Sequence, residues 1–316
     1  MSKHIPFRLA PEIRKRVTIT ADGDLLSKGT PNKFLDDIKN FEVRPTDVFV
    51  ITWPRSGTTW TQYIVSQIVH GQEFTDKHNI NRINYFIEMQ ISTVDSPEAD
   101  DKEGIYKMAE NGADPRLLKS HLQMKYLPTQ LFTKRPKVIY VARNPKDAAV
   151  SYYNFTHLNT MLPNYGDWSE FYEYFHRGLI PYGDWFEHVL SWWGMRHEPN
   201  VMFLRYEDMI KDTKQTVLKL SNFLERPLSK TDLDDISRRS EFGEMSKNRK
   251  ANNDLMNNPI FKKRDNANLK FMRKGIIGDW QNYFTMAQNN HFNTLFSDKM
   301  CDTGLTFDFV HAQSSL

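Results

Sequence analysis

Residues 48–60 read Val-Phe-Val-Ile-Thr-Trp-Pro-Arg-Ser-Gly-Thr-Thr-Trp. The apolar run 48–52 predicts a strand buried on both faces of a parallel sheet. Over 58–70 the apolar residues recur at helical spacing. Gly57 lets the backbone approach a ligand closely, and the free N–H groups of a helix N-terminus attract anions. The stretch therefore predicts a strand, an anion-binding loop and a helix, in that order.

The alternation of strand and helix recurs along the chain. Residues 137–142 read Lys-Val-Ile-Tyr-Val-Ala, a second buried strand, and Asn144 with Pro145 is typical of a helix start. Residues 201–204 predict a third strand, followed by a helical stretch through Leu224. This repetition predicts an α/β fold, a single domain with a mostly parallel central sheet flanked by helices. Ligands of such sheets bind at the carboxyl ends of the strands.

Two stretches differ from this pattern. Residues 1–40 are polar and interrupted by Pro and Gly, so we expect them to form an N-terminal segment that covers the pocket. Residues 41–316 then form the main domain. The segment 246–272 is rich in Asn, Lys and Arg with few apolar residues, and we expect a long mobile loop there, of a length that is usually either functional or disordered. Its apolar residues, with those of the region 80–91, are expected to contribute to an acceptor pocket.

Composition excludes several classes of protein. The formal net charge is +3, with acids and bases interspersed, so we expect neither nucleic acid nor a membrane as a partner. A single cysteine, Cys301, excludes an intrachain disulfide. No stretch approaches the ~20 apolar residues of a membrane helix, and no secretory signal pattern is present. A cytoplasmic location is expected.

The loop at 53–57 is P-loop-like but departs from the common nucleotide motif. That motif places a lysine and then Ser or Thr after its second glycine, whereas Gly57 is followed by Thr58 and Thr59. The threonines add hydroxyl donors, and Arg55 adds a charge with forked donors. Taken alone, a turn with a tolerated glycine is an equal alternative.

Two further segments carry anion-binding groups. Arg143 ends the second strand, and Ser151 lies two turns into the next helix; a structural ion pair is the simpler alternative for this arginine alone. Residues 273–280 read Arg-Lys-Gly-Ile-Ile-Gly-Asp-Trp, which favours a dianion site over a solvated basic turn. Together the three segments predict a ligand with two separated phosphate-type groups.

With these motifs the chain resembles the cytosolic sulfotransferases from about Phe41 to Asp302. Four of the family's patterns occur in order. T-Y-P-K-S-G-T-T-W appears as Thr-Trp-Pro-Arg-Ser-Gly-Thr-Thr-Trp at 52–60, and K-T-H appears as Lys-Ser-His at 119–121. Y-V-A-R-N-x-K-D with S-Y-Y at 140–153 and R-K-G-x-x-G-D-W at 273–280 are present in full. The resemblance implies a metal-free enzyme that transfers a sulfonate group from 3′-phosphoadenosine 5′-phosphosulfate (PAPS) to a small acceptor.

The resemblance also implies where the donor binds. The residues expected at its 5′-phosphosulfate end are Arg55, Ser56, Gly57, Thr58 and Thr59. Those expected at its 3′-phosphate are Arg143, Ser151, Arg273, Lys274 and Gly275. The adenine is expected beside Trp60, Tyr206, Ser240, Phe242 and Met245, where aromatic rings suit a stacked base.

His121 is the candidate general base, because neutral imidazole accepts a proton near pH 7. A fixed cation at the bridging oxygen of the donor would stabilise the charge that grows on the leaving phosphate. By position this cation is Arg55, where the family usually has lysine. Lys119 is a second candidate, near the transferring sulfonate, and with His121 it belongs to the expected acceptor site.

Phe86, Tyr152 and Phe155 are candidate acceptor contacts, with ordinary core packing as the alternative. An apolar pocket suits phenols, steroids and lipophilic amines alike, and we favour phenols because the central stretch resembles phenol-type members. Glu241 stands where the family often has a small hydroxyl residue beside the adenine. The family's dimer motif has lost both charges within 281–290, which leaves a homodimer open.

Two other functions are weighed against this one. A P-loop nucleotide kinase would need the missing motif lysine and magnesium. A non-catalytic nucleotide-binding protein of the same fold would be marked by loss of His121 or of the loop residues, and these are present.

Overall fold

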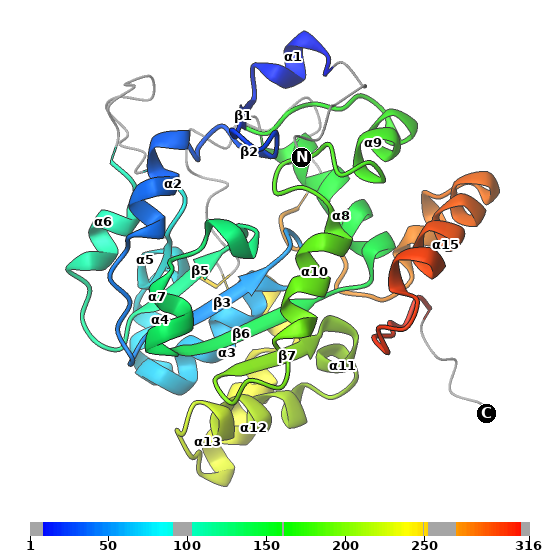
Figure 1. Cartoon of the computed structure of the whole chain (residues 1–316). Helices are drawn as coiled ribbons and strands as arrows, with labels where there is room; N and C mark the ends of the chain where they lie inside the picture. Colours follow the sequence, from blue (N-terminus) through cyan, green and yellow to red (C-terminus); the bar gives the residue numbers. More distant parts are fainter. Residues whose placement is uncertain (1–8, 91–102, 160, 249, 252–269, 311–316) are drawn as a thin grey trace, which may run out of the picture.

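The computed structural model describes residues 9–90, 103–159, 161–248, 250–251 and 270–310. At its centre lies a five-stranded sheet of order β4-β5-β3-β6-β7, with every neighbouring pair parallel (Figure 1). The strands are β3 (Val48–Thr52), β4 (Asn84–Phe86), β5 (Leu117–Ser120), β6 (Lys137–Ala142) and β7 (Val201–Arg205). The predicted parallel sheet is confirmed, and β3, β6 and β7 are the three strands that the sequence predicts.

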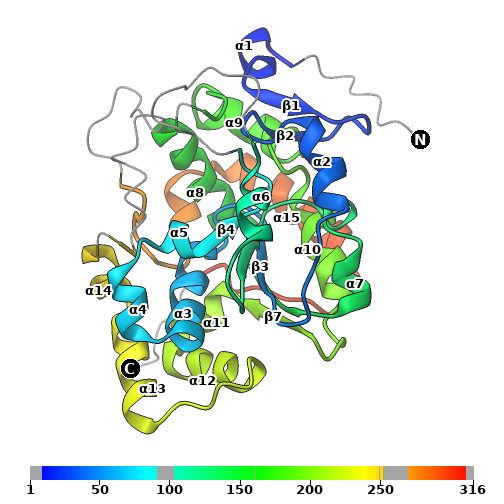
Figure 2. The ribbon, with the colours of Figure 1, turned by 90° about the vertical axis from the view of Figure 1, so that its left-hand side faces the viewer.

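Helices cover both faces of this sheet (Figures 1 and 2). Successive side chains of a strand point to opposite faces, so Val50 packs with one group of helices and Phe49 with the other. The first group is α3 (Thr58–His70), α11 (Tyr206–Lys211), α12 (Thr213–Phe223) and α13 (Lys230–Arg239). The second group is α8 (Pro145–Leu158), α9 (Trp168–Phe175), α10 (Trp185–Gly194) and α15 (Met286–Met300).

Helix α8 begins as its sequence predicts. The Asn144 side chain accepts the backbone N–H of Asp147, and Pro145 occupies the first turn. The helical stretch after β7 is divided into α11 and α12, because Asp212 caps the N-terminus of α12 by accepting the N–H of Gln215.

The described part of the N-terminal segment packs on the main core. It contains α1 (Pro11–Arg14), the antiparallel strands β1 (Val17–Ile19) and β2 (Leu25–Ser27), and α2 (Asn32–Lys39). Leu25, Phe34 and Ile38 are buried in the same hydrophobic cluster as Phe49. The segment is therefore more closely joined to the domain than its polar composition indicates.

The remaining elements are short. They are α4 (Gln72–Lys77), α5 (Ile80–Ile83), α6 (Ile105–Glu110), η1 (Met124–Tyr126), α7 (Gln130–Lys134), α14 (Phe242–Lys247) and η3 (Asp279–Asn282). Of the loop expected at 246–272, the first two residues end α14, and residues 249 and 252–269 lie outside the described part. Within the described ranges, no helix combines the length and the apolar character needed to span a membrane.

Candidate active site

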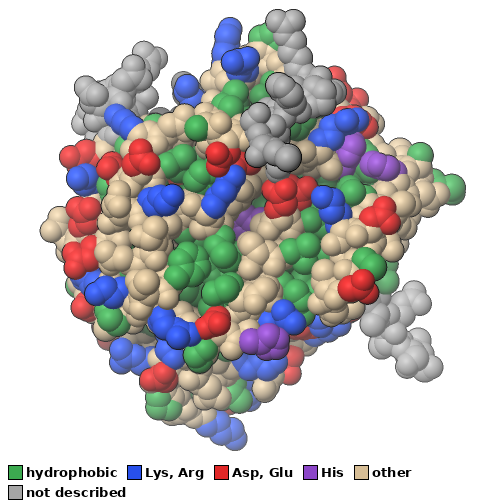
Figure 3. Space-filling model, viewed as in Figure 1, with side chains coloured by type: hydrophobic (Ala, Val, Ile, Leu, Met, Phe, Trp, Pro, Cys, Tyr) green, Lys and Arg blue, Asp and Glu red, His purple; other side chains and the backbone are tan. Residues whose placement is uncertain are grey.

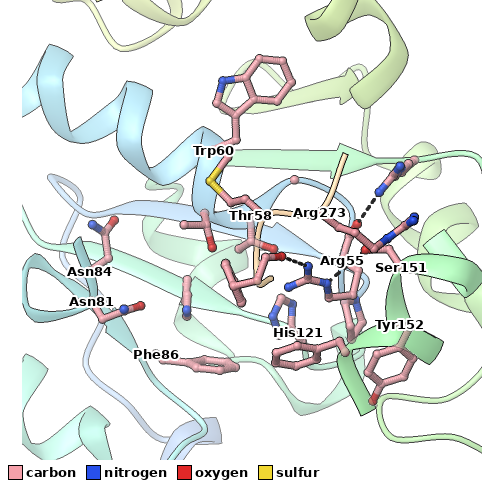
Figure 4. A pocket seen from close by; sticks show the side chains of 18 of the residues that line it. Arg55, Thr58, Trp60, Asn81, Asn84, Phe86, His121, Ser151, Tyr152 and Arg273 are labelled. Atoms are coloured by element: carbon pink, nitrogen blue, oxygen red, sulfur yellow. Dashed lines mark hydrogen bonds between the residues drawn. The ribbon is translucent and has the colours of Figure 1, made fainter. Parts of the chain in front are cut away.

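A cavity of about 650 Å³ opens at the carboxyl ends of the parallel strands, where the loops after β3, β5 and β6 meet. Every site residue predicted from the sequence lines this cavity except Ser56, which is fully buried beside it. Figure 4 shows His121 in the middle of the cavity, with Arg55, Ser151 and Arg273 on one side of it and Asn81, Asn84 and Phe86 on the other. The fold thus brings together residues that are far apart in the sequence.

The loop after β3 has the backbone of an anion-binding turn. Gly57 is the N-cap of α3 and has a φ of +106°, a backbone conformation that favours glycine. A Cβ atom at this position would lie 2.8 Å from Cδ2 of Tyr206, so a side chain would also collide. The hydroxyl groups of Thr52 and Thr58 lie 2.7 Å apart beneath the loop. Thr58 and Thr59, in the first turn of α3, line the cavity, and the first N–H groups of a helix have no partner within the helix.

Three buried donors around this loop lack a hydrogen-bond partner within the described residues. They are Ser56 Oγ, Arg143 Nε and Arg273 Nε. Arg143 donates Nη1–H to the Arg55 carbonyl at 3.3 Å and Nη2–H to the Ile276 carbonyl at 3.2 Å. Buried donors beside fixed cations suit phosphate-type oxygens, so the donor set fits an anionic ligand.

Asp147 holds the second anion segment in place. Its carboxylate accepts the N–H of Gly278 at 2.8 Å and that of Trp280 at 2.9 Å, which ties residues 273–280 to the start of α8. Within the segment, buried Asp279 forms ion pairs with Arg273 and Lys274. Because Arg143 donates to the Ile276 carbonyl, residues 273–280 also lie against the end of β6, and Arg273 and Lys274 line the same cavity as Arg143 and Ser151.

The predicted adenine residues cluster at one end of the cavity. Trp60 donates its indole N–H to the Ser240 carbonyl at 2.7 Å and packs edge-on against Tyr206, with centroids 5.6 Å apart. A Cβ on Gly275 would lie 2.2 Å from Phe242 Cδ2, so the phenyl ring covers the glycine backbone closely. Glu241 also lines this end.

His121 follows β5, and its ring orientation is fixed. Nδ1 lies 2.9 Å from the carbonyl oxygen of Thr52, and because a carbonyl only accepts, Nδ1 carries the proton. Nε2 is then the nitrogen that can take up a proton. The ring packs edge-on against Phe86 and Tyr182, at 5.1 and 5.4 Å between centroids. Burial, and after it the charge of Lys119, lowers the pKa of His121 to about 3, so the imidazole is neutral at pH 7.

Glu88 is buried beside the 119–121 segment. Its Oε1 accepts the backbone N–H of His121 at 2.6 Å, while its Oε2 has no partner among the residues described. Lys119 Nζ lies 4.3 Å from the centroid of the Phe86 ring. Burial raises the pKa of Glu88 to about 7 and lowers the pKa of Lys119 to about 8. At pH 7 a neutral imidazole and an ammonium group therefore lie close together.

Arg55 links three parts of the site. It has a φ of 66°, in the left-handed region that few non-glycine residues adopt. Nε–H donates to Ser151 Oγ at 3.2 Å, and Nη2–H donates to the Phe271 carbonyl at 2.8 Å (Figure 4). Burial, and after it the charge of Arg143, lowers the pKa of Arg55 to about 10, so the group is charged at pH 7.

The expected acceptor contacts form an apolar region next to His121. Phe86, Tyr152 and Phe155 all line the cavity. Met89, Phe271 and Met272, which also line the cavity, belong to the regions 80–91 and 246–272 from which the sequence predicts apolar acceptor contacts, whereas Met108, Met161 and Tyr182 were not predicted. Flexible methionine side chains beside aromatic rings suit apolar molecules of varied shape.

Sequence reasoning missed Glu88 and the anchoring contacts of Asp147. A signal for Glu88 exists, since it is the one charged residue in Tyr85-Phe-Ile-Glu-Met89. No comparable signal marks Phe271, because its role depends on a contact with Arg55, which is 216 positions away.

Two observations bear on the kind of ligand. On the face seen in Figure 3, Lys and Arg side chains alternate with Asp and Glu, without an extended patch of one charge. Among the described residues, no group of three or more His, Cys, Asp and Glu is arranged to hold a metal ion.

Comparison with known proteins identifies the class. The sulfotransferase domain family matches residues 45–304, so the chain belongs to the sulfotransferase family and is an enzyme of that class. It is 35% identical to sulfotransferase 1C2 of Homo sapiens over 300 residues, which covers 95% of this chain and 98% of that protein. It is 37% identical to sulfotransferase 1B1 of Canis lupus familiaris over 272 residues, covering 86% and 89%.

A solved structure agrees with this assignment. The crystal structure of retinol dehydratase in complex with androsterone and the inactive cofactor PAP matches with a TM-score of 0.78 and 27% identity. The match covers 90% of this chain and 89% of that one. The predicted fold class and the predicted sulfotransferase family are both confirmed.

Proposed function

We propose that this sulfotransferase transfers a sulfonate group from PAPS to the hydroxyl group of a small lipophilic acceptor, best a phenol, in the cytoplasm. The observation that carries the proposal is the position of His121. His121 lines the same cavity as Arg143 and Arg273, whose Nε donors lack partners among the described residues, and unpartnered Ser56 Oγ lies buried beside it. A proton acceptor and a two-part anion site in one cavity support a sulfonate donor that meets a hydroxyl acceptor.

The residues take separate roles in an in-line attack. His121 Nε2 accepts the proton of the acceptor hydroxyl as its oxygen forms a bond to sulfur. The bond between sulfur and the bridging phosphate oxygen breaks, and the leaving adenosine bisphosphate, PAP, keeps the electron pair. Arg55 and the N–H groups at the start of α3 stabilise this growing charge, and Lys119 neutralises the sulfonate oxygens. Arg143, Ser151 and Arg273 hold the 3′-phosphate.

PAPS is proposed as the donor on two grounds. The donor groups that lack partners fall into two sets, one at the loop after β3 and one between Arg143 and Arg273. Retinol dehydratase, a relative of the same fold, was solved with the inactive cofactor PAP. A nucleotide with two separated phosphate-type groups matches both observations.

The charges around the cavity favour a neutral acceptor. The lining side chains include Arg55, Lys119 and Arg273, whereas their one carboxylate in the described part, Glu241, lies at the adenine end. A protonated amine would therefore meet like charge near His121. Phenols suit this environment, because a nearby ammonium group stabilises the developing phenolate.

The N-terminal segment 1–40 is proposed to cover the acceptor end. Ser27 lines the cavity, and the Gly29 carbonyl accepts the backbone N–H of Gln90, another lining residue, at 3.0 Å. A Cβ on Gly29 would lie 2.6 Å from Cε of Met89, so this strand end packs directly on the apolar wall.

The deciding experiment is a transfer assay with labelled PAPS. Purified protein is offered 4-ethylphenol, a 3-hydroxysteroid and 2-phenylethylamine, an amine of similar size that carries no hydroxyl group. We expect labelled product with the highest kcat/KM on 4-ethylphenol. Preference for 2-phenylethylamine would overturn the acceptor class, and binding of PAP without transfer to any acceptor would favour the non-catalytic alternative.

A further inference from the structure

Arg55 contacts two aromatic rings of the acceptor end as well as the donor loop. Its Cζ atom lies 4.6 Å from the centroid of the Phe155 ring and 4.6 Å from that of Phe271. The two rings meet edge to face, with centroids 5.9 Å apart and an interplanar angle of 77°. All three side chains line the cavity. The guanidinium group and the rings therefore form one compact cluster.

The contacts of this cluster need the shape of arginine. One guanidinium group donates to Ser151 Oγ and to the Phe271 carbonyl from two different nitrogens, while its carbon faces both rings. A planar fork can make these contacts together, whereas an ammonium group is a compact, strongly hydrated point charge. The lysine that the family usually carries here would keep the charge but lose part of the cluster.

Within the cluster, the Phe271 ring is held against the Phe155 ring. Phe155 belongs to α8, whose position is set by the core, whereas Phe271 lies in an irregular segment. Phe271 is connected to the rest of the site through its backbone bond to Arg55 and its edge contact with Phe155. The guanidinium group therefore contributes to the position of the Phe271 ring through both its backbone and its ring contact.

We propose that Arg55 is a specificity-determining residue for the acceptor, which sets the wall formed by Phe155 and Phe271 so that planar aromatic acceptors are preferred. This inference rests on the proposed function, because it takes the wall to be part of the site that binds the acceptor. Flat rings pack well against edge-to-face aromatic pairs, and a flexible alkyl chain gains less from a fixed wall. The donor-loop cation thereby acts on both substrates.

The test compares binding of 2-naphthol and of 1-octanol to the PAP complex by calorimetry, for wild type, Arg55→Lys, Phe271→Leu and the double variant. Arg55→Lys is expected to weaken the binding of 2-naphthol about tenfold, which is the scale of one or two cation–π contacts. The binding of 1-octanol should weaken about twofold or less. Phe271→Leu is expected to act similarly. The double variant should bind 2-naphthol no more weakly than the weaker-binding single variant, because both substitutions disrupt the same aromatic wall.

Arg135→Lys is the matched control. Arg135 also has a positive φ, of 52°, but its ion pair with Glu198 is on the surface, so both affinities should stay unchanged. The inference would be overturned if Arg55→Lys weakened the binding of both acceptors equally. It would also be overturned if the two substitutions reduced 2-naphthol affinity independently, so that their effects multiplied in the double variant. Absence of sulfonate transfer by the wild-type protein would instead overturn the proposed function. The binding measurements do not require turnover, so the two failures can be told apart.

Discussion

His121 donates its Nδ1–H to the carbonyl oxygen of Thr52 at 2.9 Å, across 69 positions of sequence. The two residues stand at the carboxyl ends of the adjacent strands β5 and β3. The bond sets the tautomer, so that Nε2 is free to accept a proton. A second bond holds the backbone of the same residue, because His188 Nε2–H donates to the His121 carbonyl at 3.1 Å.

His121→Ala should abolish most sulfonate transfer while it leaves donor binding intact. Loss of a positioned general base lowers kcat by about 10²–10⁴-fold. The measurement is kcat in the labelled-PAPS assay, together with the Kd for PAP by calorimetry, which should change by no more than about threefold. His197→Ala, at an exposed histidine, is the control and should keep full activity. Undiminished turnover of His121→Ala would rule out the base.

The activity should fall as the pH rises through about 8. Lys119 has a pKa lowered by burial to about 8, so its charge is lost above that pH, whereas His121, with a pKa near 3, stays neutral throughout. A profile of kcat/KM between about pH 5 and 10 should show this falling limb. Lys119→Arg should move the limb to higher pH. A limb that stays in place in this variant would assign it to another group.

Donor binding should raise the pKa of His121. The value near 3 reflects burial and the neighbouring cations Lys119 and Arg55. Phosphate-type groups bring negative charge that offsets these cations, which favours the protonated imidazole. NMR titration of the imidazole signals, with and without PAP, measures the change, and His197 serves as the exposed reference. An unchanged or lower pKa in the complex would show that bound phosphates do not act on this ring.

Gly57→Ala should damage the donor loop. The φ of +106° disfavours any side chain, and the new Cβ would collide with Tyr206. We expect destabilisation of about 1–3 kcal/mol and an affinity for PAP reduced at least about tenfold. Gly194→Ala is the control, because Gly194 has no atom within 4 Å of its added Cβ and no positive φ. Equal PAP affinities of the two variants would contradict the assigned role.

Arg116→Met should destabilise the domain without touching the cavity. Arg116 donates Nε–H to Asp47 Oδ1 at 2.7 Å and Nη2–H to Oδ2 at 2.6 Å, with both side chains fully buried. An unpaired buried carboxylate costs about 3–5 kcal/mol. Urea denaturation measures the free energy of unfolding. Lys77→Ala, which breaks the exposed pair with Glu73, should cost less than about 1 kcal/mol; a similar loss in both variants would contradict the argument.

Local sequence was sufficient for the elements that dominate the fold. The apolar runs of β3 and β6 have the predicted bounds, since a strand buried on both faces needs a continuous apolar stretch. Strands β4 and β5 were missed. They span three and four residues, and Asn84, Lys119 and Ser120 interrupt their apolar character. β5 pairs with β3 and β4 pairs with β5, so their place comes from the sheet and not from their own composition.

The sequence by itself determined the class of enzyme, because each motif is a short run whose chemistry lies in its own residues: a glycine turn with hydroxyl donors at 52–60, and two cations before glycines at 273–280. Tertiary structure alone decided how the groups act on one another. The tautomer of His121, the burial of Glu88 and the contact of Arg55 with Phe271 all join distant positions. Such contacts depend on direction and on exclusion of water, and these exist only once the sheet has brought its loops to one edge.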